Sequence, residues 1–137
     1  MLLPCEIATK SVIPSIRRSL VKILYEKYGI KQVKIAEILG ITQSAVNHYL
    51  RDIRGVKINV NEIEELKNDL ESFAKKLIDE GLKTSEQIIY YCRLCSKIRA
   101  KGLMCKLHEA YDPTINLEEC QICKDLSFLL SKNKIHH

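Results

Sequence analysis

The chain has 137 residues, of which 46% are hydrophobic and 28% charged, and its formal net charge is +5. This length holds one ordinary domain or two small ones, and the apolar fraction excludes a chain that is disordered throughout. No apolar run is long enough to cross a bilayer, and the first residues do not form a secretory signal. We therefore expect a cytoplasmic protein that has no membrane partner.

Positive charge is concentrated in the first part of the chain. Residues 1–60 contain ten Lys or Arg and four Asp or Glu, whereas residues 61–90 contain four and eight. A basic segment of this kind suits the neutralisation of phosphates on a nucleic acid. It is also compatible with an ordinary solvated surface, so the charge indicates DNA only in combination with a motif.

The first predicted element is a helix from about Pro14 to Tyr28. Proline is common in the first turn of a helix, where its missing N–H costs no hydrogen bond. Apolar residues recur at helical spacing and predict a buried stripe: Ile16, Leu20, Ile23, Leu24 and Tyr28.

Two short helices joined at Gly40 are predicted between Gln32 and Arg51. The apolar side of the first helix is predicted to consist of Val33, Ala36 and Leu39. The apolar side of the second helix is predicted to consist of Val46, Tyr49 and Leu50. Glycine permits the positive φ of a tight turn, and Thr42 is a typical N-cap for the helix that follows. This arrangement is typical of a helix-turn-helix, whose second helix enters the major groove of DNA.

The outer face of the second helix carries hydrogen-bonding side chains. Gln43, Ser44 and Asn47 are predicted to read base edges, since Gln and Asn pair bidentately with adenine. His48 lies on the same face and is predicted to be a further DNA contact. Basic residues around the motif are predicted to hold phosphates: Lys31, Lys34, Arg51 and Arg54.

A further helix is predicted to open at Asn61 after the alternating stretch VKINV, which suggests a linker or a small strand. This helix has an apolar seam at spacings of three and four, formed by Ile63, Leu66, Leu70, Phe73 and Leu77. The seam fits two interpretations equally, a dimer contact or packing against the DNA-binding domain. Gly81 ends the helix, and Thr84 with Gln87 predicts a capping box for the next one.

Three ligand-type pairs follow within about thirty residues: Cys92 with Cys95, Cys105 with His108, and Cys120 with Cys123. Six cysteines in a reducing compartment favour metal or redox chemistry over structural disulfides. The repeated two-residue gap predicts a bound metal or cluster. Zinc takes four ligands from such a set, and an iron–sulfur cluster takes four thiolates. Cys5 stands apart and is predicted to be a small buried residue or a residue that approaches the centre.

The chain resembles small archaeal transcriptional regulators of the lambda-repressor-like (Cro/cI, XRE-type) helix-turn-helix class. The Leu-Pro-Cys-Glu opening and the Gln-Ser-Ala-Val start of the second helix carry the likeness. The resemblance implies base-reading roles for Gln43, Ser44, Asn47 and His48, and phosphate contacts for Gln32 and Lys34. It also implies an iron–sulfur cluster in the cysteine-rich segment.

Together these patterns predict a mostly α-helical protein in three parts. Residues 1–58 form a helix-turn-helix domain with Thr42 among its DNA-contacting residues, 59–83 a linker or dimerisation helix, and 84–137 a cysteine-rich domain. The expected function is a sequence-specific DNA-binding regulator, expected to act as a homodimer, whose cluster senses redox state or iron. The alternative is a structural zinc site that serves dimerisation or recruits a protein such as a component of the transcription machinery. Enzymatic thiol–disulfide exchange is not expected, because no βαβ pattern surrounds the cysteines.

Overall fold

The computed structural model describes residues 3–114 and residue 116. Described elements are all helical: α1 (Pro4–Ile7), η1 (Ala8–Val12), α2 (Ile13–Lys22), η2 (Ile23–Lys27), α3 (Gln32–Leu39), α4 (Gln43–Leu50), η3 (Val60–Glu62), α5 (Glu64–Asp79), α6 (Thr84–Ala100) and α7 (Cys105–Tyr111). The predicted mostly α-helical fold is therefore confirmed. None of the described helices is long and apolar enough to span a membrane.

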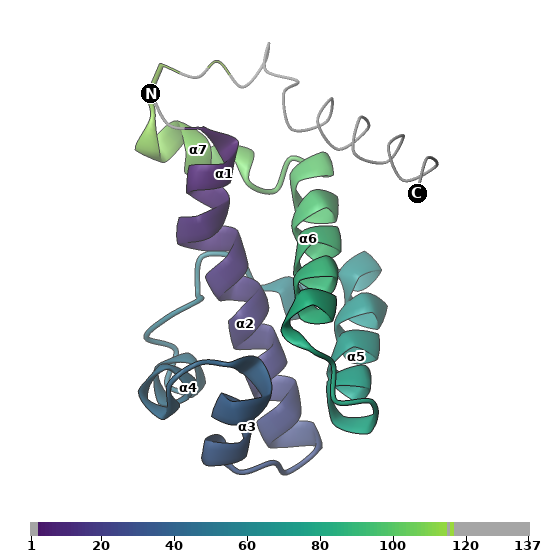
Figure 1. Ribbon diagram of the computed structural model, residues 1–137. Helices are drawn as coiled ribbons and strands as arrows, with labels where there is room; N and C mark the ends of the chain where they lie inside the picture. The colour runs from purple at the N-terminus through teal and green to yellow at the C-terminus, as the bar shows by residue number, and fades with distance from the viewer. Residues whose placement is uncertain (1–2, 115, 117–137) are drawn as a thin grey trace, which may run out of the picture.

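A long helical rod forms the centre of the molecule (Figure 1). It runs from Pro4 to Lys27 through α1, η1, α2 and η2, so the predicted start near Pro14 is wrong. The proline at a first helical position is Pro4, whereas Pro14 lies inside the rod. A wide π turn, in which the Ile13 N–H donates to the Ala8 carbonyl, directly precedes Pro14. We attribute the tolerance of this inner proline to that turn, since proline lacks an N–H and crowds the preceding helical turn.

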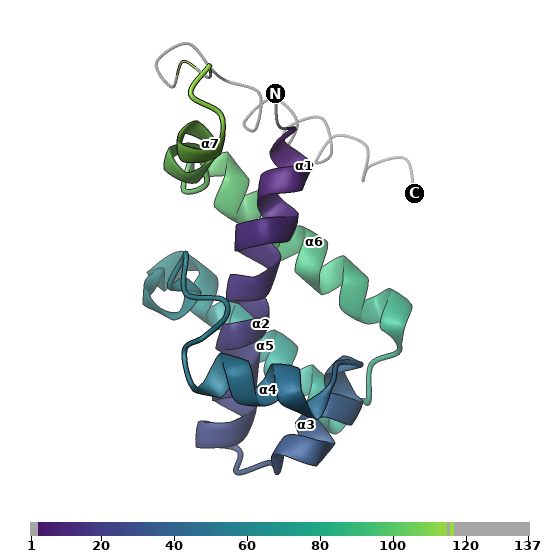
Figure 2. The same cartoon turned by 90° about the vertical axis from the view of Figure 1, so that its left-hand side faces the viewer.

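The other helices surround this rod. Helices α3 and α4 pack together, and α4 lies on the opposite side of α2 from α5 (Figures 1 and 2). Helix α6 crosses both α2 and α5, and α7 packs against α1 at the end of the molecule remote from α3. One cluster of buried side chains extends from Ile7 to Met104 and joins these helices.

The rod buries most of its predicted stripe. Ile16, Leu20 and Leu24 are fully buried and Ile23 is partly buried, but Tyr28 is 38% exposed at the end of the rod. The predicted burial of Tyr28 is therefore wrong, because the end of the rod extends beyond the hydrophobic core.

The apolar seam of α5 is buried within the chain. Leu66, Leu70, Phe73 and Leu77 are at most 2% exposed, and Ile63 is partly buried. Helix α5 packs against α2, η2 and α6, so of the two interpretations the contact within the chain is the one observed. The helix starts at Glu64 after the 3₁₀ turn η3, so the predicted start at Asn61 is wrong. The stretch VKINV forms no strand.

The capping box predicted at the start of α6 is also absent. Lys83 is the N-cap, and no side chain caps the helix. The Gln87 amide instead donates to two carbonyls, that of Leu82 at 3.1 Å and that of Ile38 in α3 at 2.9 Å. Gln87 therefore joins α6 to the first helix of the helix-turn-helix.

Candidate nucleic-acid interface and cysteine cluster

The turn between α3 and α4 has the predicted geometry. Gly40 has a φ of 65°, and the Ile41 N–H donates to the Ala36 carbonyl across the turn. The Thr42 hydroxyl oxygen accepts a hydrogen bond of 3.0 Å from the Ala45 N–H, so Thr42 is the N-cap of α4 as predicted. These short-range contacts fix the angle at which α4 leaves the turn.

Burial on α3 and α4 follows the prediction in part. Ala36, Leu39, Val46 and Tyr49 are buried, and Leu50 is partly buried. Val33 is 54% exposed, so its predicted core position is wrong; Ile35 is fully buried in the same turn. The three-residue spacing thus identified the buried face correctly at Ala36 and Leu39 but not at its first position.

Helix α4 presents the predicted base-reading residues along one outer side. Gln43 and Ser44 are exposed, and Asn47 is partly buried near the middle of the helix. His48 is also partly buried, and its Nδ1 atom is buried without a hydrogen-bond partner in the described chain. Amide and hydroxyl groups thus occupy the first two turns of the helix, where a recognition helix contacts base edges.

Cationic residues flank α3 and α4 in the sequence. Lys31, Lys34, Arg51 and Arg54 are exposed, while Gln32 is partly buried at the start of α3. Lys34 forms an exposed ion pair of 3.5 Å with Glu37. Such an exposed pair is weak, so it leaves Lys34 available to a phosphate.

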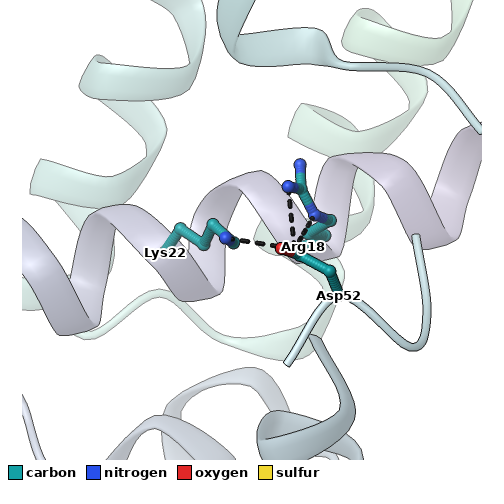
Figure 3. A network of polar contacts seen from close by, with 3 residues as sticks. All are labelled: Arg18, Lys22 and Asp52. Carbon is teal, nitrogen blue, oxygen red and sulfur yellow. Dashed lines mark hydrogen bonds and ion pairs between the residues drawn. The ribbon is translucent and has the colours of Figure 1, made fainter. Parts of the chain in front are cut away.

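Asp52 holds the end of α4 against the central rod. Its Oδ1 atom accepts from Arg18 Nε and Nη2, both at 2.8 Å, and from Lys22 Nζ at 3.1 Å (Figure 3). Hydrogen bonds from Lys22 and Arg18 lower the pKa of this carboxyl. Neither periodicity nor a motif predicted this role of Asp52; the one signal in the sequence was its position two residues after the helix, where a short polar residue favours a turn.

Gly55 allows the loop after α4 to touch the rod. Its φ is +72°, and a Cβ atom at this position would lie 2.4 Å from the Pro14 carbonyl oxygen and 2.7 Å from Arg18 Cβ. Nearby, the Ile58 N–H donates to the Ser15 hydroxyl, which donates to the Ser11 carbonyl. These contacts and Asp52 position the recognition helix relative to α2.

The cysteine pairs in the described part of the chain lie on helices. Cys92 and Cys95 are one turn apart on α6, and Cys105 and His108 are one turn apart on α7. Cys95 and His108 are buried, whereas Cys92 is exposed. Burial raises the pKa of the Cys95 thiol, and the neighbouring Arg99 opposes that rise.

Two of the six predicted ligands, Cys120 and Cys123, lie outside the described residues. Within residues 3–114 and 116, no three His, Cys, Asp or Glu side chains stand in an arrangement that already fits a metal ion. The thiol and imidazole donors present are nevertheless the ligand types that zinc and, for the thiols, iron–sulfur clusters use.

Comparison with protein families supports a DNA-binding domain in the N-terminal part of the chain. Residues 14–52 match a family described as winged helix-turn-helix DNA-binding. The matched segment spans α2, η2, α3 and α4 and ends at Asp52. The chain therefore carries an N-terminal helix-turn-helix DNA-binding domain. Such a domain supports a DNA-binding regulator. No strand follows α4 in the described chain, so the residues after it form no β-hairpin there.

Comparison with curated proteins and with solved structures finds no significant match.

Proposed function

We propose that this protein is a sequence-specific transcriptional regulator that inserts α4 into the major groove of duplex DNA. The observation that carries the proposal is the polar outer side of α4, formed by Gln43, Ser44 and Asn47, in a segment whose cations are exposed. Gln43 and Asn47 pair with base edges, and Arg51, Arg54, Lys31 and Lys34 hold phosphates. Thr42 retains its hydroxyl hydrogen for a phosphate, because its oxygen serves only as acceptor in the helix cap.

Replacement of Asn47 tests the direct reading of bases. Asn47→Ala removes an amide near the middle of α4 while keeping a good helix former. We expect a loss of roughly 1–3 kcal/mol in operator binding and a weaker preference among operator variants. The measurement is a titration of selected operators and shuffled duplexes at one fixed salt concentration. Lys34→Ala is the matched control, since loss of a phosphate contact weakens all duplexes alike.

If Asn47→Ala binds its operator with unchanged affinity and selectivity, α4 does not read bases through this residue. The fold of each variant is checked by far-UV circular dichroism.

We further propose that the cysteine-rich segment holds a metal centre that regulates DNA binding. An iron–sulfur cluster is favoured over zinc because the pairs supply five thiolates and one imidazole, which exceeds what one zinc ion needs. The position of α6 supports a regulatory role, since the helix that carries Cys92 and Cys95 also holds Ile38 of α3 through Gln87. When bound, a cluster would supply redox-sensitive chemistry at these thiols.

The likeness to lambda-repressor-like regulators supports a homodimer, which would place two recognition helices about 34 Å apart. The seam of α5 is occupied within the chain, so a dimer would use other surfaces. Light scattering at micromolar concentration tests this proposal, and a monomer that binds only single half-sites would contradict it.

A further inference from the structure

A pocket of about 350 Å³ lies between the end of the central rod and helix α5. The rod contributes Lys22 of α2 and three residues of η2, the turn η3 contributes Asn61, and α5 contributes Lys67 and Glu71. Lys67 is exposed, so a ligand can enter from solvent. Small-molecule sites have volumes of about 300–1,000 Å³, and a pocket at the lower end of this range suits a compact ligand.

The rod widens into a π turn at this pocket. In η2 the Tyr28 N–H donates to the Ile23 carbonyl at 3.3 Å, and Ile23, Glu26 and Lys27 of this turn all line the pocket. The earlier π turn, η1, is followed by a proline, but none follows η2 before α3. Because π turns within α-helices are rare and occur frequently at functional sites, η2 indicates a second site besides α4.

Two lysines of the pocket already have acidic partners. Lys22 pairs at 3.1 Å with Asp52, the residue that holds the end of α4 (Figure 3). Lys27 of η2 pairs with Glu71 of α5 and so joins two walls of the pocket. The character of the pocket therefore depends on its other charged groups.

One carboxylate and one ammonium group of the lining remain. Among residues 3–114 and 116, no ion pair involves Glu26 or Lys67, and these two side chains do not pair with each other. Glu26 lies on η2 and Lys67 on α5, so they belong to different walls of the pocket. Asn61 adds an amide that can donate and accept, and Ile23 adds an apolar surface. The lining thus offers one partner for a negative group and one for a positive group.

We propose that this pocket binds a small zwitterion that has a carboxylate and an ammonium group, which is the chemistry of a free α-amino acid. The ligand carboxylate pairs with Lys67, the ligand ammonium group pairs with Glu26, and the rest of the ligand lies against Ile23. A simple carboxylic acid or a simple amine would leave one of the two protein charges without a partner. Tight binding therefore requires both charges on one ligand.

Lys22 connects the pocket to the DNA-binding domain. Its ammonium group lines the pocket and also pairs with Asp52. A carboxylate bound in the pocket attracts Lys22 and competes with Asp52 for it. Ligand binding therefore loosens the end of α4 and lowers the affinity for operator DNA. This regulatory step rests on the proposed DNA-binding function, whereas the binding of the ligand does not.

The first experiment titrates each proteinogenic L-amino acid singly into the full chain by isothermal titration calorimetry, without DNA. We expect at least one of them to bind. The amine and the carboxylic acid that correspond to this amino acid should each bind at least about tenfold more weakly, the factor expected for one lost charge-assisted hydrogen bond. This comparison needs no variant, so it does not depend on how a variant folds.

The second experiment removes the two protein charges. Glu26→Gln and Lys67→Met keep the length of each side chain, and each should weaken binding of the same amino acid at least about tenfold. Glu86→Gln and Lys75→Met, at exposed positions outside the pocket, are the matched controls and should bind it like the parent. Thermal unfolding followed by circular dichroism shows that each variant is folded.

The third experiment measures operator affinity with and without a saturating concentration of this amino acid. We expect the ligand to weaken operator binding by the parent several-fold. Asp52→Asn keeps Lys22 in the pocket but removes the carboxylate for which the ligand competes, so its operator affinity should not respond to the ligand.

The possible failures are distinguishable. A parent that binds no amino acid, or that binds the corresponding amine or acid equally tightly, overturns the site, and so do pocket variants that bind like the parent. A bound amino acid that leaves operator affinity unchanged overturns the regulatory step alone. A parent that binds the amino acid but no duplex DNA overturns the proposed DNA-binding function, and the regulatory step with it, while the site stands.

Discussion

Asp52 is a single exposed residue on which the placement of the recognition helix depends. It has a φ of 58°, a left-handed conformation that Asp and Asn adopt more readily than most residues. Its carboxylate joins the end of α4 to Arg18 and Lys22 of the rod. The backbone conformation and the charge of Asp52 thus both determine how the end of α4 meets the rod.

The substitution Asp52→Asn separates these two roles, because Asn keeps the tolerance for positive φ but loses the charge. The pKa of Asp52 is lowered in the folded state from its ordinary value of 3.8, chiefly by the hydrogen bond from Lys22. The carboxylate therefore contributes stability above that value and loses it as the pH falls through the lower folded pKa. We expect Asp52→Asn to melt below the parent at pH 7, and the difference to shrink well below pH 3.8.

Thermal unfolding followed by circular dichroism across this pH range checks the expectation. Glu37→Gln is a suitable control, since its exposed pair with Lys34 lies within one helix. A difference between parent and Asp52→Asn that persists unchanged into strong acid would show that the charge of Asp52 does not stabilise the fold.

Close packing between elements depends on the loop after α4. Gly55 lies against the backbone of Pro14, in the rod where a π turn precedes the proline. The loop approaches the rod closely only because Gly55 has no side chain. Together with the hydrogen bond from Ile58 to Ser15, this contact keeps α4 at a defined distance from α2.

Gly55→Ala tests this packing against a matched glycine. At Gly55 the added methyl group meets the Pro14 carbonyl, so strain from positive φ and overpacking together predict a destabilisation of roughly 2–4 kcal/mol. Gly29 has a similar φ of +64° and nothing within 4 Å of an added Cβ atom. Gly29→Ala should therefore cost only about 1–2 kcal/mol. Urea unfolding measures both; equal losses would show that the contact at Gly55 has no special weight.

Across the whole molecule, α6 connects the helix-turn-helix with the region that carries the described cysteines. Near its start Gln87 holds the Ile38 carbonyl of α3, and in the middle Tyr91 lies beside Arg17 of α2 and against Phe73 of α5. Its second half carries Cys92, Cys95 and Arg99. One helix therefore joins the cysteines to the helix-turn-helix.

Gln87→Met tests this connection, because Met is of similar length but cannot donate to the two carbonyls. We expect a loss of about 1 kcal/mol in stability from the missing hydrogen bonds. We also expect a smaller difference in operator affinity between loaded and metal-free protein. Ser85→Ala, at an exposed position of the same helix, is the control. If Gln87→Met keeps the full difference in affinity, the metal state does not reach α3 through this contact.

The sequence by itself determined the helix-turn-helix. Gly40 and Thr42 act through hydrogen bonds to residues three to five positions away, and the apolar spacing of α4 depends only on the helical repeat. Local backbone geometry of this kind can be read from neighbouring residues.

Only the tertiary structure decided which surfaces the other helices cover and which distant residues meet. The seam of α5 fitted a dimer as well as an internal contact, and its burial depended on the shape of α2 and α6. Gln87 was predicted to be a capping residue, but in the folded chain its amide donates to the Ile38 carbonyl. The Arg99 guanidinium of α6 approaches the Cys5 sulfur of α1 across 94 positions of sequence. Such contacts depend on how the whole chain packs, and no periodicity in a short stretch of sequence specifies them.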